Sequence, residues 1–200
     1  MNFEKDFTYH VYNRSNNIVF KTSDNYLFFL EKFRKYISPY SDIIAWVLQP
    51  NHFHFMLVPN EKATKYIEEK HLPNTQMLSK QFGILLSSYT KAFNKQNNRK
   101  GSLFAHNTKA KLLISRNSGS NMQNNYSVSC FRYIHNNPVN HIYVKNIYDW
   151  EFSSYKDFAG IRNGNLINRK LAEEMINYNK DYFYAWSKIE LNDDDIQNIL

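Results

Sequence analysis

The chain has little cysteine, glycine or proline. Cys130 is its single cysteine, so no disulfide can form within the chain. Glycine and proline occur five times each in 200 residues, which excludes a collagen-like or low-complexity sequence. The sequence shows neither a long apolar run nor a secretory leader, and we expect a cytoplasmic protein with no membrane contact. An aromatic content of 16% predicts a folded globular protein.

Acidic residues are missing from a long central interval. After Glu69 the next carboxylate is Asp149, while lysine and arginine recur between them among tyrosines and phenylalanines. This pattern predicts a polyanionic partner whose bases stack on aromatic rings. The alternative is a solvated lysine-rich surface, although such surfaces normally mix both signs of charge. The expected DNA-binding side chains are Lys91, Lys95, Arg99, Lys100, Lys109, Lys111 and Arg132.

Hydrophobic periodicity predicts strands that alternate with helices. Strands are expected at about 7–12, 43–48, 53–58 and 110–114, and amphipathic helices at about 24–37, 77–93, 126–136 and 168–186. A short helix is expected near 64–70, and a polar loop at 115–125. The helix at 126–136 is expected to stop before Pro138, because proline disfavours helical geometry in the residue that precedes it.

Two histidines, His52 and His54, stand two residues apart on a predicted strand. Alternate side chains of a strand share one face, so both imidazoles project together. Each can offer a neutral ring nitrogen to a divalent cation. The His-x-His pattern alone is weak evidence, because hydrogen-bonded histidines at the end of a strand are common.

Tyr133 and Asn137 lie four residues apart on a predicted helix and therefore face the same way. An amide oxygen is a hard neutral ligand suited to Mg²⁺ or Mn²⁺. Asn137 could thus complete a metal site. The alternative is that Tyr133 is a core aromatic residue and that Asn137-Pro138 only ends the helix.

Two segments together resemble the motifs of a known family. Pro50-Asn51-His52-Phe53-His54 and Tyr133-Ile134-His135-Asn136-Asn137-Pro138-Val139 are similar to the motifs of single-tyrosine HUH transposases, particularly the REP-associated tyrosine transposases (RAYT). Gly101-Ser102-Leu103-Phe104 and Trp150-Glu151-Phe152-Ser153-Ser154-Tyr155 follow in the family's order, so the resemblance covers about 7–160.

The resemblance implies a fold and a division of the chain. The implied fold is α+β, an antiparallel sheet with helices mainly on one face, like a ferredoxin-like or RNA-recognition core. Residues 1–160 would form the transposase domain. Residues 161–200 would form a helical C-terminal extension that ends in the acidic tail Asp193-Asp194-Asp195.

The resemblance also implies catalytic roles. Tyr133 matches the nucleophile, and His52, His54 and Asn137 match ligands of Mg²⁺ or Mn²⁺. The implied reaction cleaves and rejoins single-stranded DNA at a REP-like hairpin through a 5′-phosphotyrosine. Insertion-sequence relatives often carry Gln where Asn137 stands, and several REP-associated relatives carry Asn. Tyr89 is the rival nucleophile, but its place on the apolar face of a helix favours packing.

Two other functions remain open, together with the oligomeric state. A catalytically degenerate protein that only binds single-stranded nucleic acid would keep the basic surface without needing His52, His54 and Tyr133. A nuclease that activates water would favour carboxylate ligands, which the interval from Lys70 to Lys145 lacks. Both a monomer and a homodimer fit the resemblance.

Overall fold

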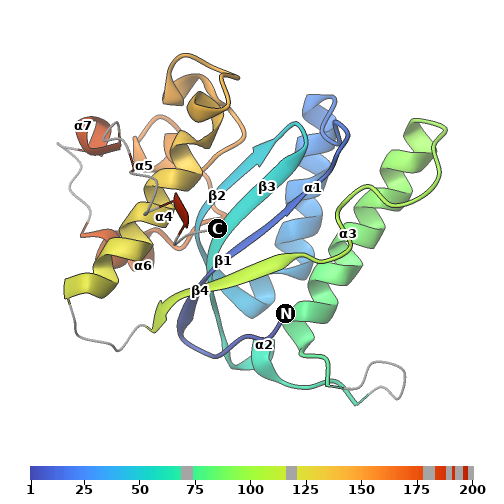
Figure 1. Cartoon of the computed structure of the whole chain (residues 1–200), viewed down its shortest axis with the longest axis horizontal. Coiled ribbons are helices and arrows are strands. Elements are labelled where there is room, and N and C mark those ends of the chain that lie inside the picture. Colours follow the sequence, from blue (N-terminus) through green and yellow to red (C-terminus); the bar gives the residue numbers. More distant parts are fainter. Residues whose placement is uncertain (69–73, 116–120, 178–182, 188–190, 192–195, 198–200) are drawn as a thin grey trace.

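A four-stranded antiparallel sheet forms the centre of the protein (Figure 1). The computed structural model describes residues 1–68, 74–115, 121–177, 183–187, 191 and 196–197. The strand order is β2-β3-β1-β4, and every neighbouring pair is antiparallel. The bounds are β1 Phe7–Arg14, β2 Ser41–Gln49, β3 His52–Pro59 and β4 Lys109–Ser115. These elements confirm the expected α+β class.

Helices α1 (Ser23–Tyr36) and α3 (Met77–Gln96) cover one face of the sheet (Figure 1). Phe53 and Phe55 of β3 face this layer, and the Phe55 ring stacks on Phe33 of α1 at 3.8 Å between centroids. The short helix α2 spans Glu61–Thr64, earlier than the segment near 64–70 in which a helix was expected. Residues 69–73 of that segment lie outside the described residues.

A second helical layer covers the opposite face. It contains α4 (Asn121–Asn140), α5 (Tyr155–Phe158), α6 (Arg169–Ile176) and α7 (Phe183–Ser187). Its core joins Val47 and Met56 of the sheet to Phe131 and Ile134 of α4. Helices therefore lie on both faces of the sheet, whereas the sequence placed them mainly on one. The acidic tail at 193–195 and residues 178–182, between α6 and α7, lie outside the described residues.

Helix α4 continues through Pro138, so the prediction that it ends at Asn136 is wrong. Proline lacks the backbone N–H that would bond to the carbonyl of Ile134, so the helix gives up one bond in its last turn. The neighbouring side chains of Ile134 and Val139 pack into the second core, which favours continued helical geometry. The extension keeps Asn137 within regular helix, one turn after Tyr133. The helix also begins at Asn121, within the segment expected to be a loop.

Ser154 joins three parts of this second layer. Its Oγ accepts a hydrogen bond from the backbone N–H of Trp46 in β2 at 2.9 Å. The same Oγ lies 2.7 Å from Nε2 of His135 in α4, and both side chains are fully buried. The segment that carries Ser154 thus covers the outer edge of β2 and fixes α4 against the sheet. No helix within the described ranges has the length and apolarity needed to cross a membrane.

Replacing Ser154 with alanine is expected to destabilise the protein by about 2 kcal/mol, because it leaves buried polar partners on Trp46 and His135 without their hydrogen bonds. Urea unfolding measures the loss. Ser87→Ala, on the exposed side of α3, is the matched control and should change stability little. Equal effects of the two substitutions would contradict this role of Ser154.

Candidate active site

The strand register gathers polar side chains on the face of the sheet that α4 covers. In antiparallel pairs, directly opposed residues point to the same side. Tyr12 of β1 lies opposite His54 of β3 and, on its other side, opposite Lys109 of β4. Arg14 lies opposite His52. The two histidines therefore share their face with a ring and two cations that the neighbouring strands supply.

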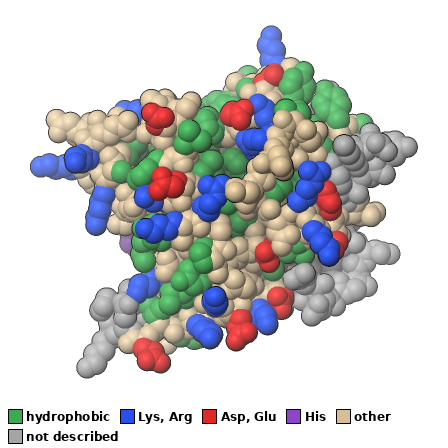
Figure 2. Space-filling view, turned by 180° about the vertical axis from the view of Figure 1, so that it is seen from behind, with side chains coloured by type: hydrophobic (Ala, Val, Ile, Leu, Met, Phe, Trp, Pro, Cys, Tyr) green, Lys and Arg blue, Asp and Glu red, His purple; other side chains and the backbone are tan. Residues whose placement is uncertain are grey.

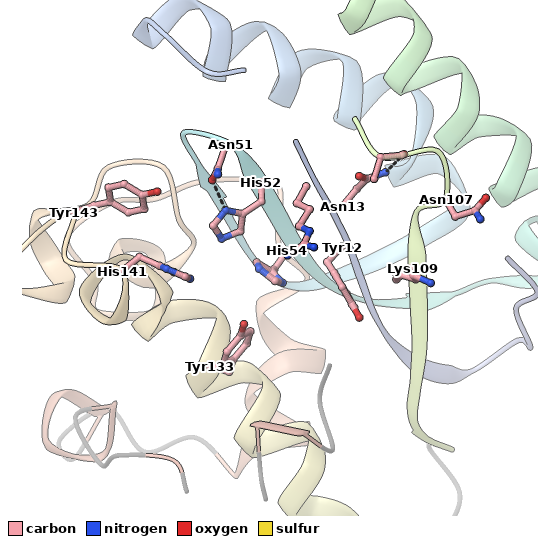
Figure 3. A pocket seen from close by; sticks show the side chains of 12 residues that line it. Tyr12, Asn13, Asn51, His52, His54, Asn107, Lys109, Tyr133, His141 and Tyr143 are labelled. Carbon is pink, nitrogen blue, oxygen red and sulfur yellow. Dashed lines mark hydrogen bonds between the residues drawn. The ribbon is translucent and has the colours of Figure 1, made fainter. Parts of the chain in front are cut away.

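Tyr133 of α4 faces the two histidines across this surface (Figure 3), and Asn137, one helical turn later, reaches His52. The Tyr133 ring meets the His54 ring edge-on, with 5.4 Å between centroids. Asn137 Oδ1 lies 3.1 Å from His52 Nε2. The structure thus brings together the four residues that the sequence marked as the catalytic and ligand set.

His52, His54 and Tyr133 line a pocket of about 590 Å³, within the range of about 300–1,000 Å³ typical of ligand sites. Its other walls include Tyr12, Arg14, Asn107, Lys109, His141 and Tyr143 (Figure 3). The pocket therefore combines imidazoles and a phenol with the two cations Arg14 and Lys109. Such a lining suits a phosphate group that carries an attached nucleotide.

His52 is held neutral by burial, and Asn51 lies beside its ring. Burial is the main cause that lowers the pKa of His52, to about 4. A neutral ring carries one N–H; with that proton on Nδ1, it donates to Asn51 Oδ1 at 2.7 Å, the shorter of its two contacts with amide oxygens, and Nε2 keeps its lone pair. That lone pair faces the amide oxygen of Asn137 at 3.1 Å. Two acceptors that face each other repel. The contact becomes favourable if a cation binds to both atoms, or if the amide group of Asn137 is turned by 180° so that its Nδ2 donates to His52.

His54 is more deeply enclosed than His52. It is 4% exposed, and burial lowers its pKa well below the usual value, with His10 and His52 adding to the effect. Its Nδ1 lies 2.9 Å from Nε2 of His10 in β1. Both histidines of the pair are therefore neutral at pH 7, which is the form that binds a metal ion.

The surroundings of Tyr133 oppose its ionisation. Burial raises the pKa of its hydroxyl, and the amide of Asn137 offsets part of the rise. The side chain is 8% exposed. A phenol in these surroundings needs help at neutral pH, either through removal of its proton or through activation of the group that it attacks.

The donor set fits a hard divalent cation at one point. Ligands at right angles around an ion, each about 2.1 Å from it, lie about 3 Å apart, close to the 3.1 Å between His52 Nε2 and Asn137 Oδ1. In the described part of the chain, no three His, Cys, Asp or Glu side chains gather as a metal site. A site here therefore depends on the amide of Asn137 as a third ligand beside the two histidines.

The seven basic residues expected to bind DNA are not gathered in one place. Lys109 lines the pocket. Lys111 follows it on β4 and donates to the backbone oxygen of Gln197, and Arg132 precedes Tyr133 on α4. The other four lie on α3 or just after it, and α3 packs on the opposite face of the sheet: Lys91, Lys95, Arg99 and Lys100. Figure 2 shows lysine and arginine scattered among acidic side chains on the rear surface.

The sequence did not single out several residues of the pocket. Tyr12 and Arg14 alternate along β1, which could have placed them on one face, but only the register with β3 places them beside the histidines. His141 and Tyr143 follow α4, where the helix was not expected to continue. Tyr89 lies in the other core, and its hydroxyl donates to the backbone oxygen of Val19 at 2.6 Å, which supports the expected packing role.

A comparison with solved structures gives the fold. No protein-family model and no curated protein matches the sequence. The structure of a REP-associated tyrosine transposase bound to a REP hairpin superposes with a TM-score of 0.53 at 17% identity, over 84% of this chain and 95% of that one. This chain has the fold of that transposase. The likeness thus extends over most of the chain.

The neutral state of His52 predicts a dependence of stability on pH. At pH 5 an unfolded histidine with pKa 6.5 is protonated, whereas folded His52, with pKa about 4, is not. Lowering the pH through this range therefore favours unfolding, by about 2 kcal/mol between pH 7 and pH 5 for this residue. Urea unfolding of the parent and of His52→Asn at both pH values measures it, and the variant should lose less stability. The same loss in both proteins would refute the assignment.

Proposed function

We propose that the protein is a metal-dependent transposase or nickase, which cleaves and rejoins single-stranded DNA through a 5′-phosphotyrosine on Tyr133. One observation carries the proposal: Tyr133 of α4 and the pair His52 and His54 of β3 meet in one pocket, with Asn137 beside them. The transposase fold supports it, and so does the basic interval of the sequence.

The covalent step requires Tyr133 to act as nucleophile. Its oxygen attacks the phosphorus of a phosphodiester, and the bond from phosphorus to the 3′ oxygen breaks. The products are a 5′-phosphotyrosyl linkage and a 3′-hydroxyl group. The proton leaves the phenol, and the 3′ oxygen gains one. Attack by the same or another 3′-hydroxyl reverses the step, so strand transfer conserves the phosphodiester energy and needs no nucleotide cofactor.

His52, His54 and Asn137 would hold Mg²⁺ or Mn²⁺ against the phosphate. When bound, the ion supplies Lewis-acid polarisation of a non-bridging oxygen. All three side chains are neutral donors, so they leave the positive charge of the ion available to the phosphate. The amide of Asn137 also lowers the pKa of Tyr133 and so favours the phenolate. Asn137 thereby links the cation site to the nucleophile.

The remaining walls of the pocket position the DNA strand. Arg14 and Lys109 lie on the histidine face and suit phosphates that flank the scissile one. Tyr143, which is 41% exposed, offers a ring for a base. The transposase of the same fold binds a REP hairpin, and we propose a structured hairpin with a single-stranded flank as the substrate. We propose that cleavage takes place in the cytoplasm and that the protein acts as a monomer or a homodimer.

Tyr133→Phe is expected to abolish the covalent protein–DNA species and to leave DNA binding unchanged, because it removes only the attacking oxygen. A labelled hairpin oligonucleotide with single-stranded flanks, in Mn²⁺, reports the adduct as a band that survives denaturation. A persistent adduct in this variant would disprove the assignment of the nucleophile.

Two controls belong to the same assay. Tyr89→Phe changes the rival tyrosine in the other core and should leave the adduct in place. A chelator should remove the adduct from the parent protein, and undiminished cleavage in chelator would contradict the metal role. Binding of intact hairpin without any adduct in the parent would instead indicate the catalytically degenerate alternative.

Lys109→Ala is expected to weaken binding of the hairpin and to lower the slope of log affinity against log salt by about one, because one phosphate contact is lost. Lys91→Ala, on α3 at the opposite face of the sheet, is the matched control and should change neither. Binding isotherms at several salt concentrations measure both. A larger effect of Lys91→Ala would place the DNA on the α3 face instead.

A further inference from the structure

His10 is a buried histidine that the proposed reaction leaves without a role. It lies on β1, fully buried, and points to the same face of the sheet as Tyr12 and His54. Its Nε2 is 2.9 Å from Nδ1 of His54, and the two ring planes are inclined by only 20°. Nitrogen lone pairs and N–H bonds lie in the plane of the ring, so this geometry fits one direct hydrogen bond.

A single proton is shared in this contact, and its position decides what His54 can do. A neutral imidazole carries one N–H. With the proton on His54 Nδ1, the other nitrogen of His54 keeps a lone pair for a cation. With the proton on His10 Nε2, His54 Nδ1 is the acceptor, and His54 Nε2 carries the N–H and cannot bind a metal ion.

We propose that His10 is a positioning residue that accepts the Nδ1–H of His54 and so holds its Nε2 ready to bind a divalent cation. The inference rests on the cation site of the proposed function. His52 and His54 would then be oriented in the same way, each through its Nδ1: Asn51 Oδ1 lies 2.7 Å from Nδ1 of His52, as His10 Nε2 lies beside Nδ1 of His54. Support of a ligand histidine through its second nitrogen is a general feature of metal sites.

The surroundings of His10 hold its ring in place for this task. Tyr12 stacks against it at 4.9 Å between centroids, and the Tyr133 ring meets it edge-on at 6.0 Å. His10 therefore contacts both a ligand and the nucleophile from one position on the central strand β1. A change at His10 acts on the cation through the orientation and tautomer of His54, without contact to the cation itself.

The first test measures the tautomer directly in the metal-free protein. Long-range ¹H–¹⁵N spectra at pH 7 distinguish Nδ1–H from Nε2–H for each histidine, and His54→Gln assigns the signals of His54. The expected result is an Nδ1–H tautomer for His54. An Nε2–H tautomer for His54 would overturn the proposal, whatever the protein does with DNA.

The second test measures Mn²⁺ affinity by calorimetry, without DNA. His10→Leu removes the acceptor and is expected to weaken binding by about 10–100-fold, whereas His10→Gln, which keeps an acceptor, should recover part of the loss. His106→Leu, at an exposed histidine outside the pocket lining, is the control and should bind like the parent. Circular dichroism confirms that each variant is folded.

The two tests separate the two proposals. Unchanged Mn²⁺ affinity in folded His10→Leu would overturn the role of His10 while leaving the cation site intact. Failure of the parent to bind Mn²⁺ would overturn the metal part of the proposed function and the role of His10 in it, while the adduct assay still judges Tyr133.

Discussion

The pairing of β1 with β3 is the constraint on which the pocket depends. Tyr12 stands beside His54, and Arg14 beside His52, only in the observed register, and a slip of one residue would turn each row to the opposite face. The register is held from the other side of the sheet, where Val11, Phe53 and Phe55 are fully buried under α1 and α3. The hydrophobic core on one face therefore sets the geometry of the polar site on the other.

The second constraint is the position of α4. His135 and Ser154 hold this helix against β2 through a buried hydrogen bond, and Phe131 packs beside them. The helix then covers the histidines, and this burial acts on the site in two opposite ways. It keeps His52 and His54 neutral, which favours a cation, and it raises the pKa of Tyr133, which opposes the nucleophile. Burial under α4 thus keeps the proposed ligands neutral, and it also makes Tyr133 depend on the ion that they would hold.

The sequence predicted those parts of the protein that depend on local periodicity or on a motif. Alternation along β3 placed His52 and His54 together, and helical spacing placed Tyr133 and Asn137 together. The continuation of α4 through Pro138 was missed, because burial of its neighbours outweighs the local preference of proline. His10 and Arg14 were missed because strand order and register decide their neighbours, and neither can be read from one strand alone. The acid-free interval did not show where its basic residues lie in the fold, since Lys91 and Lys109 lie on opposite faces of the sheet.

In the proposed reaction, different groups of the pocket bind the DNA and cleave it. Its ligand side chains are neutral, so without a divalent ion the attraction for phosphate comes from Arg14 and Lys109 at the pocket wall. These cations lie on β1 and β4, and their field does not depend on the tautomer of a histidine. The ion, in contrast, would act at a single phosphate, and its retention depends on lone pairs that Asn51 and His10 direct through the second nitrogen of each ligand. Loss of one buried hydrogen bond at His10 would then weaken retention of the ion and slow the chemistry, while the protein stays bound to its DNA.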